Sequence, residues 1–85
     1  MLQKQVTIAS ADGLHARPAN DFAKLAMTLP GQVMVSRPGG TKVRGDSILS
    51  LMTLGLRGGE SVVVEIADDS QETLLESLIN LLSAP

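Results

Sequence analysis

Apolar and polar residues alternate at the start of the chain, and the period then changes. The alternation over residues 2–8 predicts a half-buried strand, with Lys4 as the exception. From Ala16 onward apolar residues recur every three or four positions, which is typical of one face of an amphipathic helix. That face consists of Ala19, Phe22, Ala23 and Ala26. The pair Pro30-Gly31 is expected to end the helix.

Short apolar stretches separated by turn residues fill the middle of the chain. Strands are predicted near residues 32–37 and at Thr41–Arg44, and the turn signal Pro38-Gly39-Gly40 between them is typical of a hairpin. A short helix is expected next, because Asp46 or Ser47 can cap the segment that follows.

The last part of the chain predicts one more strand and one more helix. The dense apolar run Ser61–Ala67 suits a central strand, and Asp68-Asp69-Ser70 signals the start of a helix. The apolar face of that helix consists of Leu74, Leu75, Leu78, Ile79 and Leu82. The resulting order βαββαβα predicts an α+β domain, in which a four-stranded antiparallel sheet is covered by helices on one face.

The composition narrows the classes of protein that this chain can represent. Its 85 residues suffice for one core, and the expected single domain spans residues 1–85. The absence of cysteine excludes disulfides and thiolate zinc sites and fits a reducing cytoplasm. A net charge of −2 and a single aromatic residue, Phe22, argue against nucleic-acid binding. No apolar run is long enough for membrane insertion, and Leu2-Gln3-Lys4-Gln5 is too polar for a signal peptide.

Candidate chemistry is concentrated in the stretch from Gly13 to Ala19, at the junction of the first strand and the first helix. Gly13 suits a tight turn and Pro18 the first turn of a helix. His15 and Arg17 would then stand at a helix N-terminus, where free amides and the helix dipole favour an anion. This position also lowers the pKa of the imidazole, which keeps a nitrogen lone pair available to attack phosphorus. The combination indicates a site that receives a phosphoryl group.

Other interpretations of these residues are weaker or remain open. His15 is the only histidine, so a metal site lacks a second imidazole or thiolate ligand, and no serine or cysteine nucleophile supports a hydrolase. The simplest alternatives to a phosphoryl site are that His15 is a loop histidine without a function and that Arg17 is a solvated surface charge. Asp12 is most simply a turn residue or a helix cap, and it can also orient the imidazole by accepting a hydrogen bond from it.

The segment after residue 45 is a second candidate site. Ser47 is by default a helix cap, and phosphorylation is the functional alternative because a phosphate is tolerated at a helix N-terminus. Ile48, Leu51 and Met52 belong either to the core or, where exposed, to an apolar docking surface.

Two segments of the chain carry a resemblance to a known family. Gly13-Leu14-His15-Ala16-Arg17-Pro18-Ala19 is similar to the active-site motif of the histidine-containing phosphocarrier (HPr) family of the bacterial phosphoenolpyruvate-dependent sugar phosphotransferase system. The segment from Asp46 to Leu56 resembles the second signature of that family, around its regulatory serine. The likeness covers essentially the whole chain. It implies an open-faced β-sandwich of four antiparallel strands with three helices, and a monomer without cofactor or metal.

The resemblance also implies roles for single residues and for partners. Enzyme I, charged by phosphoenolpyruvate, would phosphorylate His15 on Nδ1, and the group would pass to the A domain of a sugar-specific enzyme II. Arg17 would balance the phosphate. A serine kinase/phosphorylase would modify Ser47, and the modified form would slow phosphotransfer or bind a transcription regulator. The surface for partners would consist of Ala16, Ile48, Leu49 and Met52, and no role is assigned to Asn20.

Three departures from the family and three rival functions accompany this resemblance. Asp12 places a carboxylate where many relatives have a neutral residue, and Gly45-Asp46 precedes Ser47 without the base that many regulated relatives have beside the serine. The segment Arg37-Pro38-Gly39-Gly40 is one residue longer than in common relatives. The rivals are a carrier of a nitrogen-related or dihydroxyacetone kinase branch, a binding module that acts through Ser47, and a small hydrolase.

Overall fold

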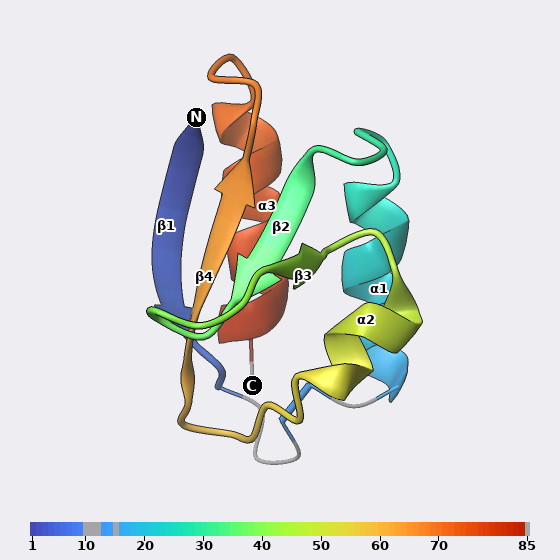
Figure 1. The fold of residues 1–85 in the computed structure, drawn as a ribbon, viewed down its shortest axis with the longest axis vertical. Helices are drawn as coiled ribbons and strands as arrows, with labels where there is room; N and C mark the ends of the chain where they lie inside the picture. Colours follow the sequence, from blue (N-terminus) through green and yellow to red (C-terminus); the bar gives the residue numbers. More distant parts are fainter. Residues whose placement is uncertain (10–12, 15, 85) are drawn as a thin grey trace.

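The structure is a computed structural model that describes residues 1–9, 13–14 and 16–84 of the chain. Within these residues, strands and helices follow one another in the order that the hydrophobic pattern predicts (Figure 1). In chain order they are β1 (Leu2–Thr7), α1 (Ala16–Ala26), β2 (Val33–Ser36), β3 (Val43–Arg44), α2 (Ile48–Thr53), β4 (Ser61–Ile66) and α3 (Glu72–Ser83). The predicted order βαββαβα is therefore confirmed.

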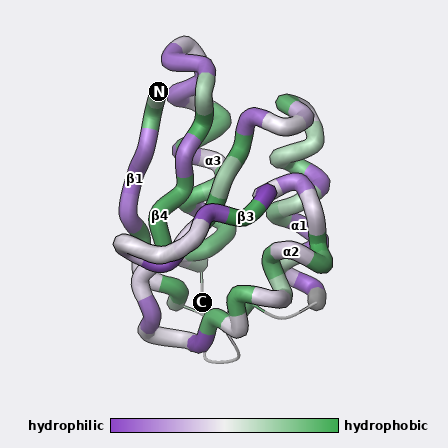
Figure 2. Tube along the Cα trace, in the orientation of Figure 1, coloured by the Kyte–Doolittle hydropathy of each residue, from purple (hydrophilic) through white to green (hydrophobic). Residues whose placement is uncertain are grey.

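The strands form one antiparallel sheet in the order β1-β4-β2-β3. Central β4 pairs with β1 on one side and β2 on the other, so that Ile66 lies opposite both Leu2 and Val33. Val62, Val64 and Ile66 are fully buried, as expected for a dense apolar run in a central strand. Edge strand β1 is mostly hydrophilic (Figure 2).

The helices cover one face of this sheet and leave the other face open (Figure 1). α3 packs against β1 and β4, and α1 packs against both α3 and α2. The α1 face predicted from the spacing, Ala19 to Ala26, is buried in the core together with Leu51 of α2. The predicted open-faced α+β sandwich is thus confirmed. The buried face of α3 consists of Leu75, Leu78, Ile79 and Leu82.

Two helix boundaries differ from the predicted ones. α1 ends at Ala26, and the chain then runs through turns up to Gln32. α3 begins only at Glu72, because Asp68 closes a turn of its own. Its Oδ1 accepts hydrogen bonds from the amide of Ser70 at 2.9 Å and from the hydroxyl of Ser70 at 2.7 Å. The predicted helix signal at residues 68–70 therefore forms the preceding turn.

The strand boundaries also shift slightly. β1 and β4 each end one residue earlier than predicted, and β2 is one residue shorter than predicted at both ends. β3 covers only Val43–Arg44 instead of Thr41–Arg44. The connection before β3 is a turn in which the amide of Gly40 donates to the carbonyl of Arg37 at 2.8 Å. The hairpin expected at residues 38–40 is confirmed, because Val35 pairs with Val43.

Candidate functional site

The described residues on either side of His15 define the candidate site, while His15 and Asp12 themselves lie outside the described residues. Ala16 is the first residue of α1, and Arg17 is exposed in its first turn. That turn carries no acidic residue. Arg17 therefore lies at the positive end of the helix dipole, and both the dipole and a guanidinium favour an anion.

Both the backbone conformation at Gly13 and the lack of room for a Cβ there favour glycine. Its φ is +74°, a left-handed backbone conformation that other residues adopt at a cost. A Cβ at this position would lie 2.3 Å from the carbonyl oxygen of Leu56 and 2.7 Å from the Cα of Arg57. The turn predicted from Gly13 is therefore also a site of close backbone contact with the loop that follows α2.

Leu14 anchors the same segment to the core. Its side chain is buried, and its amide donates to the carbonyl of Leu56 at 3.1 Å. Leu56 is itself buried in the core. The chain directly before His15 is thus held by a hydrogen bond and by apolar packing, while α1 begins directly after it.

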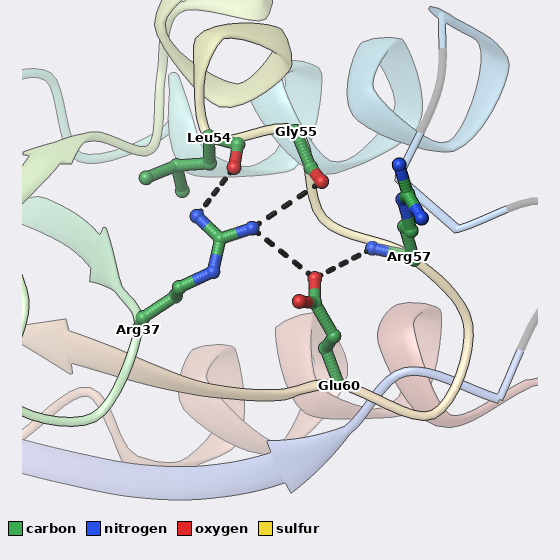
Figure 3. A network of polar contacts seen from close by, with 5 residues as sticks. All are labelled: Arg37, Leu54, Gly55, Arg57 and Glu60. Atoms are coloured by element: carbon green, nitrogen blue, oxygen red, sulfur yellow. Dashed lines mark hydrogen bonds and ion pairs between the residues drawn. The ribbon is translucent and has the colours of Figure 1, made fainter.

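A polar network around Arg37 holds the loop that faces Gly13 (Figure 3). The guanidinium of Arg37 donates to the carbonyls of Leu54 and Gly55 at the end of α2 and to Oε2 of Glu60. The same carboxylate oxygen accepts the backbone amide of Arg57 at 2.7 Å. The hydrogen bond from the Arg57 amide, more than the neighbouring guanidinium of Arg37, lowers the pKa of Glu60.

The hydrophobic pattern and the motifs of the sequence do not predict this network. Arg37 lies in the hairpin connection, and Glu60 in the loop before β4, 23 residues later. Charged residues in loops are normally solvated, and their spacing in the chain does not indicate a contact. The one signal in the sequence is the extra length of the segment 37–40, which by itself does not indicate a contact with Glu60.

Ser47 is the N-cap of α2, which resolves the choice between Asp46 and Ser47. Its Oγ accepts the amide of Ser50 at 3.2 Å. The Asp46 carboxylate is instead engaged by Arg44, through Nε at 2.9 Å and Nη2 at 2.7 Å, and by the amide of Gly31 at 3.0 Å. The Arg44 hydrogen bond, followed by that from Gly31, lowers the pKa of Asp46.

One face of α2 is buried and the other presents apolar side chains to solvent. Leu51 is fully buried, whereas Ile48, Leu49 and Met52 are 38%, 75% and 44% exposed. We call these three exposed residues the α2 patch. Because α2 packs on α1 and its following loop contacts Gly13, the patch lies at the same end of the molecule as the start of α1 (Figure 1). The side chain of Ala16, which was also assigned to the partner surface, lies outside the described part of the structure.

Within residues 1–9, 13–14 and 16–84, no three His, Asp or Glu side chains gather as metal ligands. A hollow on the open face of the sheet is lined by Met34, Lys42 and Glu65 among others, at the end of the sheet opposite Gly13. Lys42 and Glu65 form an ion pair there, with Nζ and Oε2 2.9 Å apart.

Known proteins resemble this chain in both sequence and structure. Residues 2–84 match the family model described as PTS HPr component phosphorylation site. The phosphocarrier protein HPr of Streptomyces coelicolor is 34% identical over 83 residues, which cover 98% of this chain and 89% of that protein. The crystal structure of HPr-C-His from Thermoanaerobacter tengcongensis superposes with a TM-score of 0.85 at 32% identity, and covers 96% of this chain and 91% of that one.

A similar segment also occurs in a much longer protein. The multiphosphoryl transfer protein of Xanthomonas campestris pv. campestris is 38% identical over 72 residues, which cover 85% of this chain and 8% of that protein. As to membranes, no helix within the described ranges combines the length and the apolar character needed for a crossing.

Proposed function

The chain belongs to the HPr family of phosphocarrier proteins, which are not enzymes, and from this premise we propose that His15 carries a phosphoryl group between phosphotransferase components during sugar uptake. The donor is enzyme I charged by phosphoenolpyruvate, and the acceptor is the A domain of a sugar-specific enzyme II. The protein acts as a cytoplasmic monomer of one domain and needs no cofactor or metal.

One observation carries this proposal. Gly13 and Leu14 are seated against Leu56 and Arg57 directly before His15, and α1 begins directly after it. The chain is therefore held on both sides of position 15, and α1 presents its positive end there. A carrier needs such a rigid presentation, because the same nitrogen must enter the active sites of successive partners in a reproducible geometry.

The transfer step follows from the chemistry of a neutral imidazole. The Nδ1 lone pair of His15 attacks phosphorus, so that a nitrogen–phosphorus bond forms while the bond to the donor side chain of enzyme I breaks. The bonding electron pair leaves with the donor group, and the other ring nitrogen of His15 keeps its proton. In the second transfer a group of the enzyme II domain attacks phosphorus, the nitrogen–phosphorus bond breaks, and its electron pair returns to Nδ1 of His15. Arg17 and the α1 N-terminus lower the free energy of the added negative charge.

The α2 patch supplies the apolar part of the surface that docks on both partners. Leu49 is the most exposed of its three residues, and an exposed apolar side chain beside a reactive group suits a protein contact. Ala16 belongs to the same contact surface, because it directly follows His15.

Ser47 is the proposed point of regulation. A serine kinase/phosphorylase modifies it, and the modified form slows phosphotransfer or binds a transcription regulator. Ser47 stands at the N-cap of α2, directly before the α2 patch. A phosphate there would place negative charge at the edge of the docking surface, which would slow transfer to a partner whose contact is apolar.

Incubation with enzyme I and radiolabelled phosphoenolpyruvate tests the main proposal. The expected product carries an acid-labile, alkali-stable phosphate, and His15→Ala carries none. Arg17→Ala serves as a matched variant in the same turn, for which slower labelling but an intact site is expected. Undiminished labelling of His15→Ala, or none in the unmodified protein, contradicts the proposal. A second incubation with ATP and the serine kinase tests Ser47, with Ser47→Ala as the control.

A further inference from the structure

Arg57 is a basic residue on the loop that seats the segment before His15. Its Cα lies 2.7 Å from the point that a Cβ on Gly13 would occupy, which is direct backbone contact. The neighbouring Leu56 carbonyl accepts the amide of Leu14. Arg57 is thus placed by two contacts beside the residues that lead into His15, although it lies 42 positions later in the chain.

The backbone of Arg57 is held, while its side chain is directed elsewhere. Its amide donates to Oε2 of Glu60, and the guanidinium of Arg37 fixes that carboxylate from the other side. The guanidinium of Arg57 points away from the Glu60 carboxylate (Figure 3). In the part of the chain that the structure describes, no carboxylate forms an ion pair with it, and the residue is exposed.

We propose that Arg57 supplies a second guanidinium charge, beside Arg17, to the phosphorylated state of His15. This inference rests on the proposed function. A phosphoryl group on nitrogen brings up to two negative charges, and one guanidinium together with a helix N-terminus neutralises them only in part. A second fixed cation lowers the free energy of that state without deep burial, which suits a group that must leave again.

The Arg37–Glu60 network explains why a loop residue can serve in this way. An unrestrained arginine loses side-chain and backbone freedom when it orders around a phosphate. Here the backbone of Arg57 is already fixed by Glu60 and by the contact with Gly13. Only the side chain has to be ordered, so the loss of conformational entropy offsets less of the electrostatic gain. Arg37 and Glu60 act through Arg57 and need not contact the phosphate.

The test compares Arg57→Met, Arg57→Lys and a matched control, Lys4→Met. Lys4 lies on exposed edge strand β1, and its replacement changes the net charge equally. Two quantities are measured: the pKa of His15 by NMR titration of the free protein, and the equilibrium constant for phosphoryl transfer from enzyme I.

The expected result is specific to the charge of Arg57. Loss of a nearby cation favours the imidazolium, so Arg57→Met raises the pKa of His15 by a few tenths of a unit, whereas Lys4→Met leaves it unchanged. The transfer equilibrium constant falls about two- to five-fold in Arg57→Met, the size expected for an exposed charge pair. Arg57→Lys retains both values near those of the parent. At about 1 M salt, where the screening length is about 3 Å, the difference shrinks.

Other results overturn the inference and separate it from the proposed function. If Arg57→Met and Lys4→Met give the same pKa and the same equilibrium constant, Arg57 has no such role. If Arg57→Lys fails like Arg57→Met and salt has no effect, the role is structural and the proposal is wrong. If the unmodified protein is not phosphorylated at all, the proposed function fails first, whereas the NMR titration still reports whether the Arg57 charge acts on His15.

Discussion

The amide of Leu14 donates a hydrogen bond to the carbonyl of Leu56 at 3.1 Å, and both side chains are buried. This bond ties the residue directly before His15 to the loop directly after α2. The exposed residues of α2 are therefore kept at a constant position relative to the segment that contains His15. The proposed docking surface and the proposed transfer point are thus held together although the chain separates them by more than thirty residues.

Replacement of Gly13 by alanine is expected to strain the protein at this junction. The left-handed backbone costs a residue with a Cβ about 1–2 kcal/mol, and the collision with Leu56 adds about 1–3 kcal/mol. Gly39→Ala is the matched control, because its φ is also +74° but nothing lies within 4 Å of the added Cβ. Urea denaturation should show the larger loss of stability for Gly13→Ala. Equal losses would mean that the loop yields without cost.

The two faces of α2 should separate stability from partner binding. Leu51→Ala removes a fully buried side chain and is expected to lower the free energy of unfolding by about 2–5 kcal/mol. Leu49→Ala removes an exposed one and should change stability by less than about 0.5 kcal/mol. Phosphotransfer assays at varied concentration should instead show a raised KM for enzyme I in Leu49→Ala. An unchanged KM would exclude Leu49 from the docking surface.

Substitutions of Ser47 should distinguish its capping role from an effect of charge. Ser47→Ala loses the bond to the Ser50 amide and is expected to destabilise the protein by about 0.5–2 kcal/mol. Ser47→Asp keeps a good capping oxygen, so its stability should stay close to that of the parent while phosphotransfer slows. Thermal unfolding and transfer rates are measured on both variants. Parent-like transfer by Ser47→Asp would argue against regulation by charge at this position.

Stability in acid should depend on Asp46. The Arg44 and Gly31 hydrogen bonds hold its pKa below the ordinary value of 3.8, so the unfolded chain takes up the proton first. The resulting stabilisation is present above the unfolded pKa and is lost as the pH falls through the lower, folded pKa. Asp46→Asn should be less stable at neutral pH and should lose less stability on acidification.

Urea denaturation at several pH values measures this difference, with Asp21→Asn on the exposed surface of α1 as a control. The control should follow the parent curve. Some acid sensitivity should remain in Asp46→Asn, because the pKa of Glu60 is also lowered, first by the Arg57 amide. Parallel curves for Asp46→Asn and the parent would show that the Arg44 pair does not contribute.

The sequence by itself determined the elements, the fold class and the identity of the candidate site. Alternation, helical spacing and turn residues are local properties, and they predicted the order of elements and the buried faces of α1 and α3. The compact stretch from Gly13 to Arg17 could be recognised because glycine, histidine, arginine and a helix start lie within a few residues of one another. The predictions of where α1 ends and where α3 begins were less accurate, since turns at residues 27–32 and 68–70 compete locally with the helix.

Only the tertiary structure decided how distant segments meet. Gly13 is required by contact with Leu56 and Arg57 as well as by its own turn, and the division of α2 into buried Leu51 and exposed Leu49 depends on how α2 packs against α1. The network that holds Arg57 joins a hairpin connection to a loop 23 residues away. Such contacts arise from the folding of the whole chain around one core, and the spacing of residues along the sequence does not encode them in any local pattern.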